Sequence, residues 1–284
     1  MPDRRFGVST HLFHDRRLTR EDLVDVAAHG FELIELFATR THFDYRDQAA
    51  IADLREWLSD TKLGLHSVHA PVMEGMRGGQ WVGSFSIASG DEPRRKAAVA
   101  EAQAALAIAA VIPFHYLVIH VGMPNGQQIP AGDNQPDAAR RSVIEIVEAA
   151  ARVHVRVALE VMPNPLSSAV GLVQAIEDRL EGVDVGICLD YGHAHLMTDV
   201  AEAVETVSGH LWTTHVHDNH GKRDEHLVPY GGSINWDEAM MTTQKIGYDG
   251  VLMFEVGGSG AEPVELLKRI AKARERLEQT FVMF

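Results

Sequence analysis

The sequence predicts an α/β fold, a single (β/α)8 TIM barrel formed by residues 1–284. Short apolar, β-branched segments alternate with longer amphipathic ones, and this alternation occurs eight times without an intervening linker or change of composition. The length of 284 residues is typical of such a barrel built as one domain. An open, doubly wound sheet is the competing architecture, but no Gly-x-Gly-x-x-Gly follows the first predicted strand.

The eight predicted strands are apolar almost throughout, as parallel strands covered on both faces are. They are Phe6–Phe13, Phe31–Ala38, Leu63–Ala70, His115–Val121, Arg156–Val161, Val185–Asp190, Trp212–His217 and Val251–Val256. The long connections follow the third and seventh strands, at Met73–Gly90 and Asp218–Asn235. Long loops on a rigid scaffold are typically functional or mobile.

A helix is expected after each strand. The first begins at Thr19, which can cap the helix together with Asp22, and ends at His29-Gly30, where glycine suits the left-handed conformation. The other expected helices are Arg46–Asp60, Pro93–Ala110, Pro136–Arg152, Ser167–Leu180, Asp199–Ser208, Trp236–Ile246 and Pro263–Gln279.

The composition excludes several classes of protein. Hydrophobic residues make up 45% and charged residues 23%, so the chain is not intrinsically disordered. The single cysteine, Cys188, excludes an internal disulfide and is compatible with a reducing compartment. The net charge of −14 disfavours nucleic acids and anionic membranes as partners. Because the sequence has neither a signal-peptide pattern nor an uninterrupted apolar span, we expect a cytoplasmic protein without a membrane segment.

Ionisable residues end six consecutive predicted strands, from the third to the eighth. In a (β/α)8 barrel the C-terminal strand ends meet at one rim, which is where the chemistry takes place. A single histidine at such a position is more often a hydrogen-bonded structural residue, but six ionisable strand ends in a row are not expected by chance. The residues in question are His69, His120, Glu160, Asp190, His215 with His217, and Glu255.

Two glutamates, one aspartate and one histidine form a mixed oxygen and nitrogen ligand set. Such a set suits Mn²⁺, Mg²⁺ or Co²⁺, with Zn²⁺ as a further option. A metal of this kind polarises a carbonyl or hydroxyl oxygen of a bound polyol. We expect Glu160 and Glu255 to face each other across the mouth, because they end the fifth and eighth strands. Two opposed carboxylates can remove a proton from one face of a carbon and return one to the other, which describes isomerisation or epimerisation through an enediolate.

Further histidines and carboxylates are expected at the same rim. His193 follows Asp190 by three residues across a glycine-containing turn, which can bring it back to the mouth. His215 and His217 point to one face of their strand, and only one of them need be a ligand. Asp224 and His226 form an Asp-x-His pair in the loop after the seventh strand. Together with His69 and His120 these residues would suffice for a multinuclear site. We also expect His11 and His66 to line the pocket, and His195 and His220 to be exposed or to support the site from behind.

At this point several segments resemble a known superfamily. In chain order they are Ser67-Val68-His69-Ala70-Pro71, Leu159-Glu160-Val161-Met162-Pro163-Asn164, Cys188-Leu189-Asp190-Tyr191-Gly192-His193, His215-Val216-His217-Asp218-Asn219, Asp224-Glu225-His226, Gly232-Ser233-Ile234-Asn235-Trp236 and Phe254-Glu255. The chain resembles the xylose isomerase-like TIM-barrel superfamily, which includes sugar isomerases, ketose 3-epimerases, inosose dehydratases and endonuclease IV. The ordered set is specific for the superfamily rather than for one reaction.

The resemblance implies two alternative sites. In the epimerase-like branch one metal is held by Glu160, Asp190, His215 and Glu255, with both glutamates also acting as acid and base and His193 binding substrate oxygens. In the endonuclease IV-like branch three zinc ions act on abasic DNA. Their ligands would correspond to His69, His120, Glu160, Asp190, His193, His215, Asp224, His226 and Glu255.

Three features favour the sugar branch and a sugar or polyol substrate. The loop after the seventh strand and the segment Asn164–Ser168 both resemble uncharacterised sugar isomerase-like members. The loops have no cluster of Arg and Lys with apolar wedges for kinked DNA, so we do not expect a nucleic-acid partner. One departure is Tyr230-Gly231-Gly232-Ser233, where the resemblance leads one to expect Gly-Glu-Gly. A non-catalytic binding protein is the third hypothesis, and the two glutamates disfavour it.

The apolar C-terminal end is Phe281-Val282-Met283-Phe284. It either forms the interface of a homo-oligomer or packs on the barrel floor.

Overall fold

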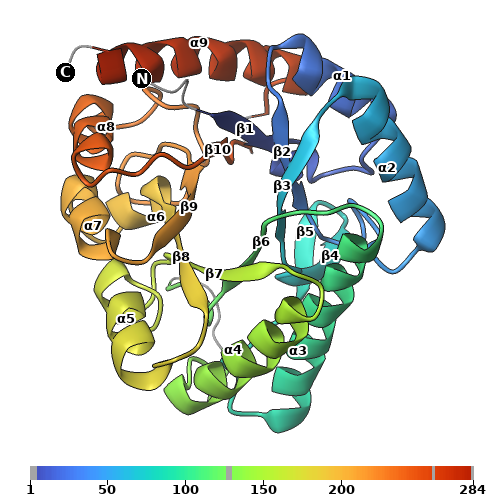
Figure 1. Ribbon diagram of the computed structural model, residues 1–284, viewed down its shortest axis with the longest axis vertical. Helices are drawn as coiled ribbons and strands as arrows, with labels where there is room; N and C mark the ends of the chain where they lie inside the picture. The colour runs from blue at the N-terminus through green and yellow to red at the C-terminus, as the bar shows by residue number, and fades with distance from the viewer. Residues whose placement is uncertain (1–4, 126–129, 258–259, 283–284) are drawn as a thin grey trace.

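The fold is a closed barrel of eight parallel strands with helices around it (Figure 1), as predicted. The structure is a computed structural model, and it describes residues 5–125, 130–257 and 260–282. Around the barrel the strands follow the order β1, β10, β9, β8, β7, β6, β3, β2. Their bounds are β1 Phe6–Ser9, β2 Leu33–Phe37, β3 Gly64–His69, β6 Tyr116–His120, β7 Arg156–Glu160, β8 Val185–Asp190, β9 Leu211–Val216 and β10 Leu252–Phe254.

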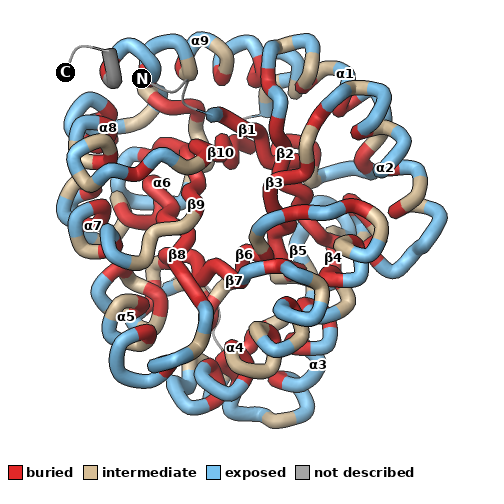
Figure 2. The backbone as a smooth tube through the Cα atoms, viewed as in Figure 1, coloured by how far each residue is buried: buried red, intermediate tan, exposed pale blue. Residues whose placement is uncertain are grey.

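The helices cover the outside of the barrel, and Figure 2 shows a buried wall of strands inside a ring of helices with exposed outer faces. Thr19 caps α1 as predicted, because its side chain accepts from the Asp22 amide while the Asp22 carboxylate accepts from the Thr19 amide. The helices are α1 Arg20–Ala28, α2 Gln48–Thr61, α3 Glu92–Ala105, α4 Pro136–Ala151, α5 Ala169–Gln174, α6 Tyr191–His195, α7 Val200–Val207, α8 Trp236–Lys245 and α9 Pro263–Val282.

Three predicted elements change their geometry part-way along. The first strand ends at Ser9, because the Ser9 hydroxyl caps a 3₁₀ turn at Thr10–Phe13 by accepting from the His11 amide. The helix predicted at Pro93–Ala110 changes to a 3₁₀ turn at Leu106–Ala110, shortly before Pro113, which cannot continue a helix. The helix predicted at Ser167–Leu180 ends in a π-helical turn at Ala175–Arg179, closed by the Leu180 amide bonding to the Ala175 carbonyl.

The long connection after β3 contains a β-hairpin that the sequence analysis did not predict. Strands β4 (Met73–Arg77) and β5 (Gln80–Ser84) pair with each other in a separate two-stranded sheet. Gly78 and Gly79 form its turn with φ values of 57° and 76°, which glycine adopts without steric cost. The Gly-Gly pair was the signal available in the sequence.

Two further expectations concern a membrane segment and a homo-oligomer. In the described part of the chain, no helix is long and apolar enough to cross a membrane. The apolar C-terminal end at residues 281–284 lies outside the residues whose side chains the structure describes. The homo-oligomer expected from it therefore stays a prediction.

Candidate metal centre

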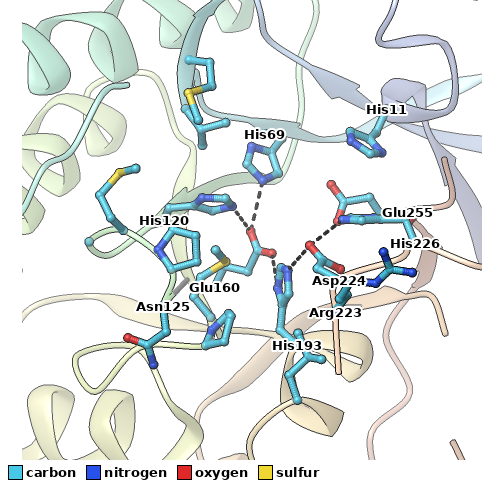
Figure 3. A pocket seen from close by; sticks show the side chains of 18 of the residues that line it. His11, His69, His120, Asn125, Glu160, His193, Arg223, Asp224, His226 and Glu255 are labelled. Carbon is cyan, nitrogen blue, oxygen red and sulfur yellow. Dashed lines mark hydrogen bonds and ion pairs between the residues drawn. The ribbon is translucent and has the colours of Figure 1, made fainter. Parts of the chain in front are cut away.

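Four of the ionisable strand ends, His69, His120, Glu160 and Glu255, line a cavity of about 580 Å³ at one end of the barrel, whereas Asp190, His215 and His217 are buried outside its lining. Register places neighbouring ligands at one level, because His120 pairs with Glu160 across β6 and β7, and Asp190 pairs with His215 across β8 and β9. His69 ends β3, and Glu255 follows β10 directly. Figure 3 shows Glu160 between His69, His120 and His193, and Asp224 between His193 and His226. The structure thus brings all ten predicted site residues together in three groups, two of which share Glu160.

The first group, here called the central site, consists of Glu160, Asp190, His215 and Glu255, all buried. His215 Nδ1 lies 3.5 Å from Glu160 Oε1, 3.8 Å from Asp190 Oδ2 and 3.3 Å from Glu255 Oε2. The two glutamates were expected to face each other across the mouth. Both approach the same imidazole nitrogen, Glu160 from the end of β7 and Glu255 from just after β10, and these two strands are separated by β8 and β9.

A buried carboxylate on the other side of His215 decides what the central site can hold. His215 Nε2 lies 3.0 Å from Glu35 Oε2, so the Nε2 proton is donated to Glu35. In the neutral imidazole the lone pair of Nδ1 then points at the carboxylates of the central site. Among the residues that the structure describes, neither Nδ1 nor Glu160 Oε1 has a hydrogen-bond partner. Buried lone pairs that converge in this way repel one another unless a cation lies between them, either a proton on Nδ1 or a metal ion that replaces it, so these residues fit a divalent metal.

Glu35 is the functional residue that the sequence analysis missed. It lies on β2, fully buried, and accepts hydrogen bonds from Ser9 Oγ at 3.1 Å and Ser67 Oγ at 2.8 Å as well as from His215. A carboxylate that receives the second N–H of a ligating histidine fixes its tautomer and ring orientation. The available signal was a single charged residue inside the apolar segment Leu33–Phe37.

The second group, the β3–β6 site, consists of His69, His120 and Glu160. His69 Nε2 lies 3.1 Å and His120 Nε2 lies 3.0 Å from Glu160 Oε2. His69 Nδ1 donates to the Ala70 carbonyl at 2.9 Å, which turns Nε2 toward the carboxylate. Because Oε1 of Glu160 faces His215 and His193 while Oε2 faces His69 and His120, this residue can bridge two sites.

The third group, the loop site, consists of His193, His217, Asp224 and His226. Asp224 Oδ2 lies 3.1 Å from His193 Nε2 and 3.0 Å from His226 Nε2. The other ring nitrogens of these two histidines donate to backbone carbonyls, His193 Nδ1 to Val161 at 3.1 Å and His226 Nδ1 to Glu255 at 2.8 Å. Both imidazoles are therefore oriented with Nε2 toward Asp224.

The carboxylates of these sites are matched by imidazolium charge. Burial alone raises the pKa of Glu160, but the imidazoles of His120 and His215 outweigh it and hold the pKa well below its usual value. Burial lowers the pKa of His69, but Glu160 raises it to about 9. At neutral pH protonated histidines therefore lie beside ionised carboxylates, and a binding metal ion displaces those protons.

The remaining histidines occupy different surroundings. His11 lines the cavity, as predicted, and its ring lies 4.7 Å from that of His226. His66 does not belong to the cavity lining, because it lies buried lower in the barrel with Nε2 3.2 Å from Thr213 Oγ1. His220 is exposed and binds Glu225 at 2.8 Å, while His195 contacts Ser233 at 2.9 Å on the outer side of the loop.

The sequence profile of the family described as "Xylose isomerase-like TIM barrel" matches residues 23–280 of this chain. The chain belongs to this family. A relative that is 30% identical over 89% of this chain and 84% of its own length is the uncharacterised protein MJ1311 of Methanocaldococcus jannaschii.

Solved structures of the same fold include proteins named for sugars and for zinc. A D-tagatose 3-epimerase-like protein is 26% identical, with a TM-score of 0.77 over 98% of this chain and 97% of its own. The IolI protein, solved with a bound zinc atom, is 17% identical, with a TM-score of 0.75 over 98% of this chain and 99% of its own. At that identity the IolI protein is similar to this family member in fold alone.

Proposed function

We propose that the protein is a divalent-metal-dependent isomerase or epimerase of a sugar or sugar derivative in the cytoplasm. The observation that carries this proposal is the convergence of Glu160, Glu255 and Asp190 on the Nδ1 lone pair of His215, with both glutamates also lining the cavity. Its family and its similarity to a D-tagatose 3-epimerase-like protein point to the same class of reaction.

The central site would hold Mn²⁺, Mg²⁺, Co²⁺ or Zn²⁺ through Glu160, Asp190, His215 and Glu255. When bound, such an ion polarises carbonyl and hydroxyl oxygens of the substrate and so acidifies the neighbouring carbon.

The two glutamates move the protons. Burial raises the pKa of Glu255, but the imidazoles of His215 and His11 outweigh it and hold the pKa well below its usual value, as in Glu160. Both carboxylates are therefore available as bases at neutral pH. One removes the proton from the carbon next to the carbonyl, and the other passes a proton from solvent to that carbon or its neighbour.

The cavity suits a small polyol. Its volume of about 580 Å³ lies within the range of small-molecule sites. Imidazoles and carboxylates form its floor, where they can bind hydroxyl groups, while Phe37, Trp81 and Phe85 form an apolar wall against which the C–H face of a sugar can pack. Only Lys222 and Arg223 bring ammonium or guanidinium charge to the lining in the described part of the chain, which favours a small substrate over a nucleic-acid duplex.

The test is proton exchange with solvent. Protein loaded with one metal at a time is incubated with a panel of ketoses, aldoses and cyclic polyols in D₂O, and deuterium on carbon is followed by NMR. We expect deuterium in any sugar that is converted, and turnover lower by about 10²–10⁴-fold in Glu160→Gln and Glu255→Gln. Glu56→Gln, an exposed carboxylate on α2, is the matched control. Conversion of a sugar without deuterium uptake would contradict the proposal.

A second candidate function rests on one specific observation. The three groups together contain every residue expected of an endonuclease IV-like trinuclear zinc phosphodiesterase, with Glu160 shared between two of them. A nicking assay on duplex DNA with one abasic site, using zinc-loaded protein, decides this alternative. Strand cleavage that requires His69 and His120 would favour it over the isomerase.

A further inference from the structure

Four methionines line the cavity, and they come from the loops that follow four neighbouring strands of the barrel, β3, β6, β7 and β8. Each follows an ionisable residue of the site by two to four positions. The four pairs are His69 with Met73, His120 with Met123, Glu160 with Met162, and His193 with Met197. Four of the ten methionines of the chain therefore lie along one arc of the cavity, here called the methionine arc.

The opposite side of the cavity is charged. The loop after β9 brings the side chains of Lys222 and Arg223 to the lining. In Figure 3 the yellow sulfur atoms lie on the side of His120, away from Arg223 and His226. The cavity thus has an apolar side and a charged side, and a ligand that fills both must itself be apolar at one end.

The backbone of the methionine arc uses its polar groups within the protein. The Met123 amide donates to Asn134 Oδ1 at 2.7 Å, and the Met123 carbonyl accepts from Asn134 Nδ2 at 3.1 Å. The Met162 amide donates to the Ser167 carbonyl at 2.8 Å, and the Met162 carbonyl accepts from the Asn164 amide at 2.7 Å. Because these backbone groups are already paired, the two residues present mainly their thioether side chains to a ligand.

The neighbours of the four methionines complete an apolar surface. In the described parts of the loops after β3, β6, β7 and α6, Asn125 is the one hydrophilic side chain of the lining. A hydroxyl group that is moved from water to such a surface loses hydrogen bonds that the surface cannot replace. The sugar hydroxyls therefore do not match this arc, whereas an apolar group does. The other lining residues of these loops are Val72, Trp81, Phe85, Gly122, Pro124, Pro163 and Leu196.

Methionine narrows the chemistry of that apolar group. Its thioether is flexible and polarisable, so it adapts to groups of different shape and makes favourable contacts between sulfur and aromatic rings. The rings of Trp81 and Phe85 continue the same surface and can pack against another ring. The cavity volume of about 580 Å³ lies within the range occupied by drug-sized ligands, which are larger than one sugar ring. The cavity therefore has room for a sugar together with an aromatic substituent.

We propose that the substrate is a sugar that carries an aromatic group, and that the methionine arc binds this group. The sugar lies beside Glu160 and Glu255, and the aromatic ring lies against the four thioethers. A bare sugar would leave the arc in contact with water, and a second sugar ring would place hydroxyl groups against it. The inference rests on the proposed function, because it names the substrate class of the same cavity.

The experiment observes the methionine methyl groups by NMR. Full-length protein is labelled with ¹³C at these methyl groups, and each arc signal is assigned by a single Met→Leu substitution. The probes are benzyl alcohol, which carries no sugar, and matched phenyl and methyl glycosides of several hexoses and pentoses. We expect benzyl alcohol to shift the four arc signals. At least one phenyl glycoside should bind at least ~10-fold more tightly than its methyl counterpart, as partial burial of an aromatic ring predicts. The signal of Met241, which is exposed on α8, should not move.

Two substitutions test whether the arc itself provides the preference. Met73→Gln and Met197→Gln replace half-buried methionines with a polar side chain of similar length. We expect each to reduce the preference for phenyl over methyl glycosides by about 3-fold, because part of the apolar contact is lost. Met73→Leu and Met197→Leu should keep the preference, since they conserve apolar volume. Met241→Gln, which changes an exposed methionine outside the cavity, is the matched control.

Arc signals that respond neither to benzyl alcohol nor to any phenyl glycoside would overturn the proposal. Maltose or cellobiose shifting them more strongly than the phenyl glycosides would overturn it as well, because the arc would then bind a second sugar. A phenyl preference that is unchanged in Met73→Gln and Met197→Gln would place the ring elsewhere. None of these readouts requires turnover. If the sugar panel fails while the arc signals respond, the proposed reaction is refuted and the aromatic subsite is retained.

Discussion

Glu35 offers the sharpest test of how the central site is organised. The substitution Glu35→Gln keeps the size of the side chain and changes its charge. Its carbonyl oxygen can still accept from His215 and from Ser67, which bind the same carboxylate oxygen at 3.0 and 2.8 Å. Its amide group then faces the Ser9 hydroxyl, 3.1 Å from the other oxygen in the wild type, which can accept. All three contacts therefore survive, and only the negative charge is lost.

The expected loss of metal affinity follows from the loss of this negative charge. A hydrogen bond to a charged group contributes about 1.5–3 kcal/mol and a neutral one about 0.5–1.5 kcal/mol, so the loss is about 1–1.5 kcal/mol. That corresponds to metal affinity about 10-fold weaker at the central site. Glu35→Ala leaves the His215 Nε2–H without its acceptor, and its effect should approach the ~100-fold limit for residues behind a metal ligand.

Zn²⁺ affinity is measured by competition with a chelator at several pH values. Burial lowers the pKa of His215, but Glu35 and the other acidic neighbours raise it well above its usual value, so protons compete with the metal in the wild type. The effect of Glu35→Gln should therefore be largest at high pH, where that competition ends. Glu101→Gln, a buried carboxylate that pairs with Arg46, is the control. Wild-type affinity in Glu35→Gln at every pH would refute the role of Glu35.

Three further outcomes are expected. Burial, which outweighs a backbone hydrogen bond, lowers the pKa of His42 from 6.5 to about 4. The stability that neutral His42 contributes is therefore fully present above pH 6.5 and is lost as pH falls toward 4. Between pH 7 and pH 5 the free energy of unfolding, measured with urea, should fall by about 2 kcal/mol less in His42→Gln than in the wild type. An equal fall in the two proteins would contradict the assignment. Gly192→Ala should displace the ring of His217 and lower the free energy of unfolding by about 1–3 kcal/mol. Gly209→Ala is the control, because a Cβ there meets no described atom within 4 Å, and it should have only the small effect of a surface substitution. Removing bound metal with a chelator should lower Tm reversibly, because an ion that binds only the folded chain stabilises it by mass action, and an unchanged Tm would argue against resident ions.

The strand ends were predictable because parallel topology leaves little freedom. Once eight apolar segments close into a barrel, residues such as His120 and Glu160 must lie at one level, and their register confirms it. The cap at Thr19 followed from chemistry confined to a few adjacent residues. The grouping into three sites was harder, since His217 and Glu160 each approach more than one neighbour.

The role of Glu35 and the β4–β5 hairpin were not predicted from the sequence, for different physical reasons. The partners of Glu35 lie 26 residues away at Ser9 and 180 residues away at His215, and no local pattern announces such contacts. The hairpin strands β4 and β5 show little apolar alternation, because most of their residues are exposed or half-buried. Only the turn glycines marked them.

The β4–β5 hairpin is a part of the cavity wall that can vary independently of the barrel. Its two strands form a sheet separate from the barrel, yet Trp81 lines the cavity, with its ring centroid 5.4 Å from that of His14 and 6.2 Å from that of Phe37. Insertions or exchanges in this segment can remodel the wall of the cavity while strand closure and the ligand residues stay unchanged. Evolution can therefore change which molecule is accepted without rebuilding the reacting groups, and a hairpin transplanted between relatives should carry part of the preference with it.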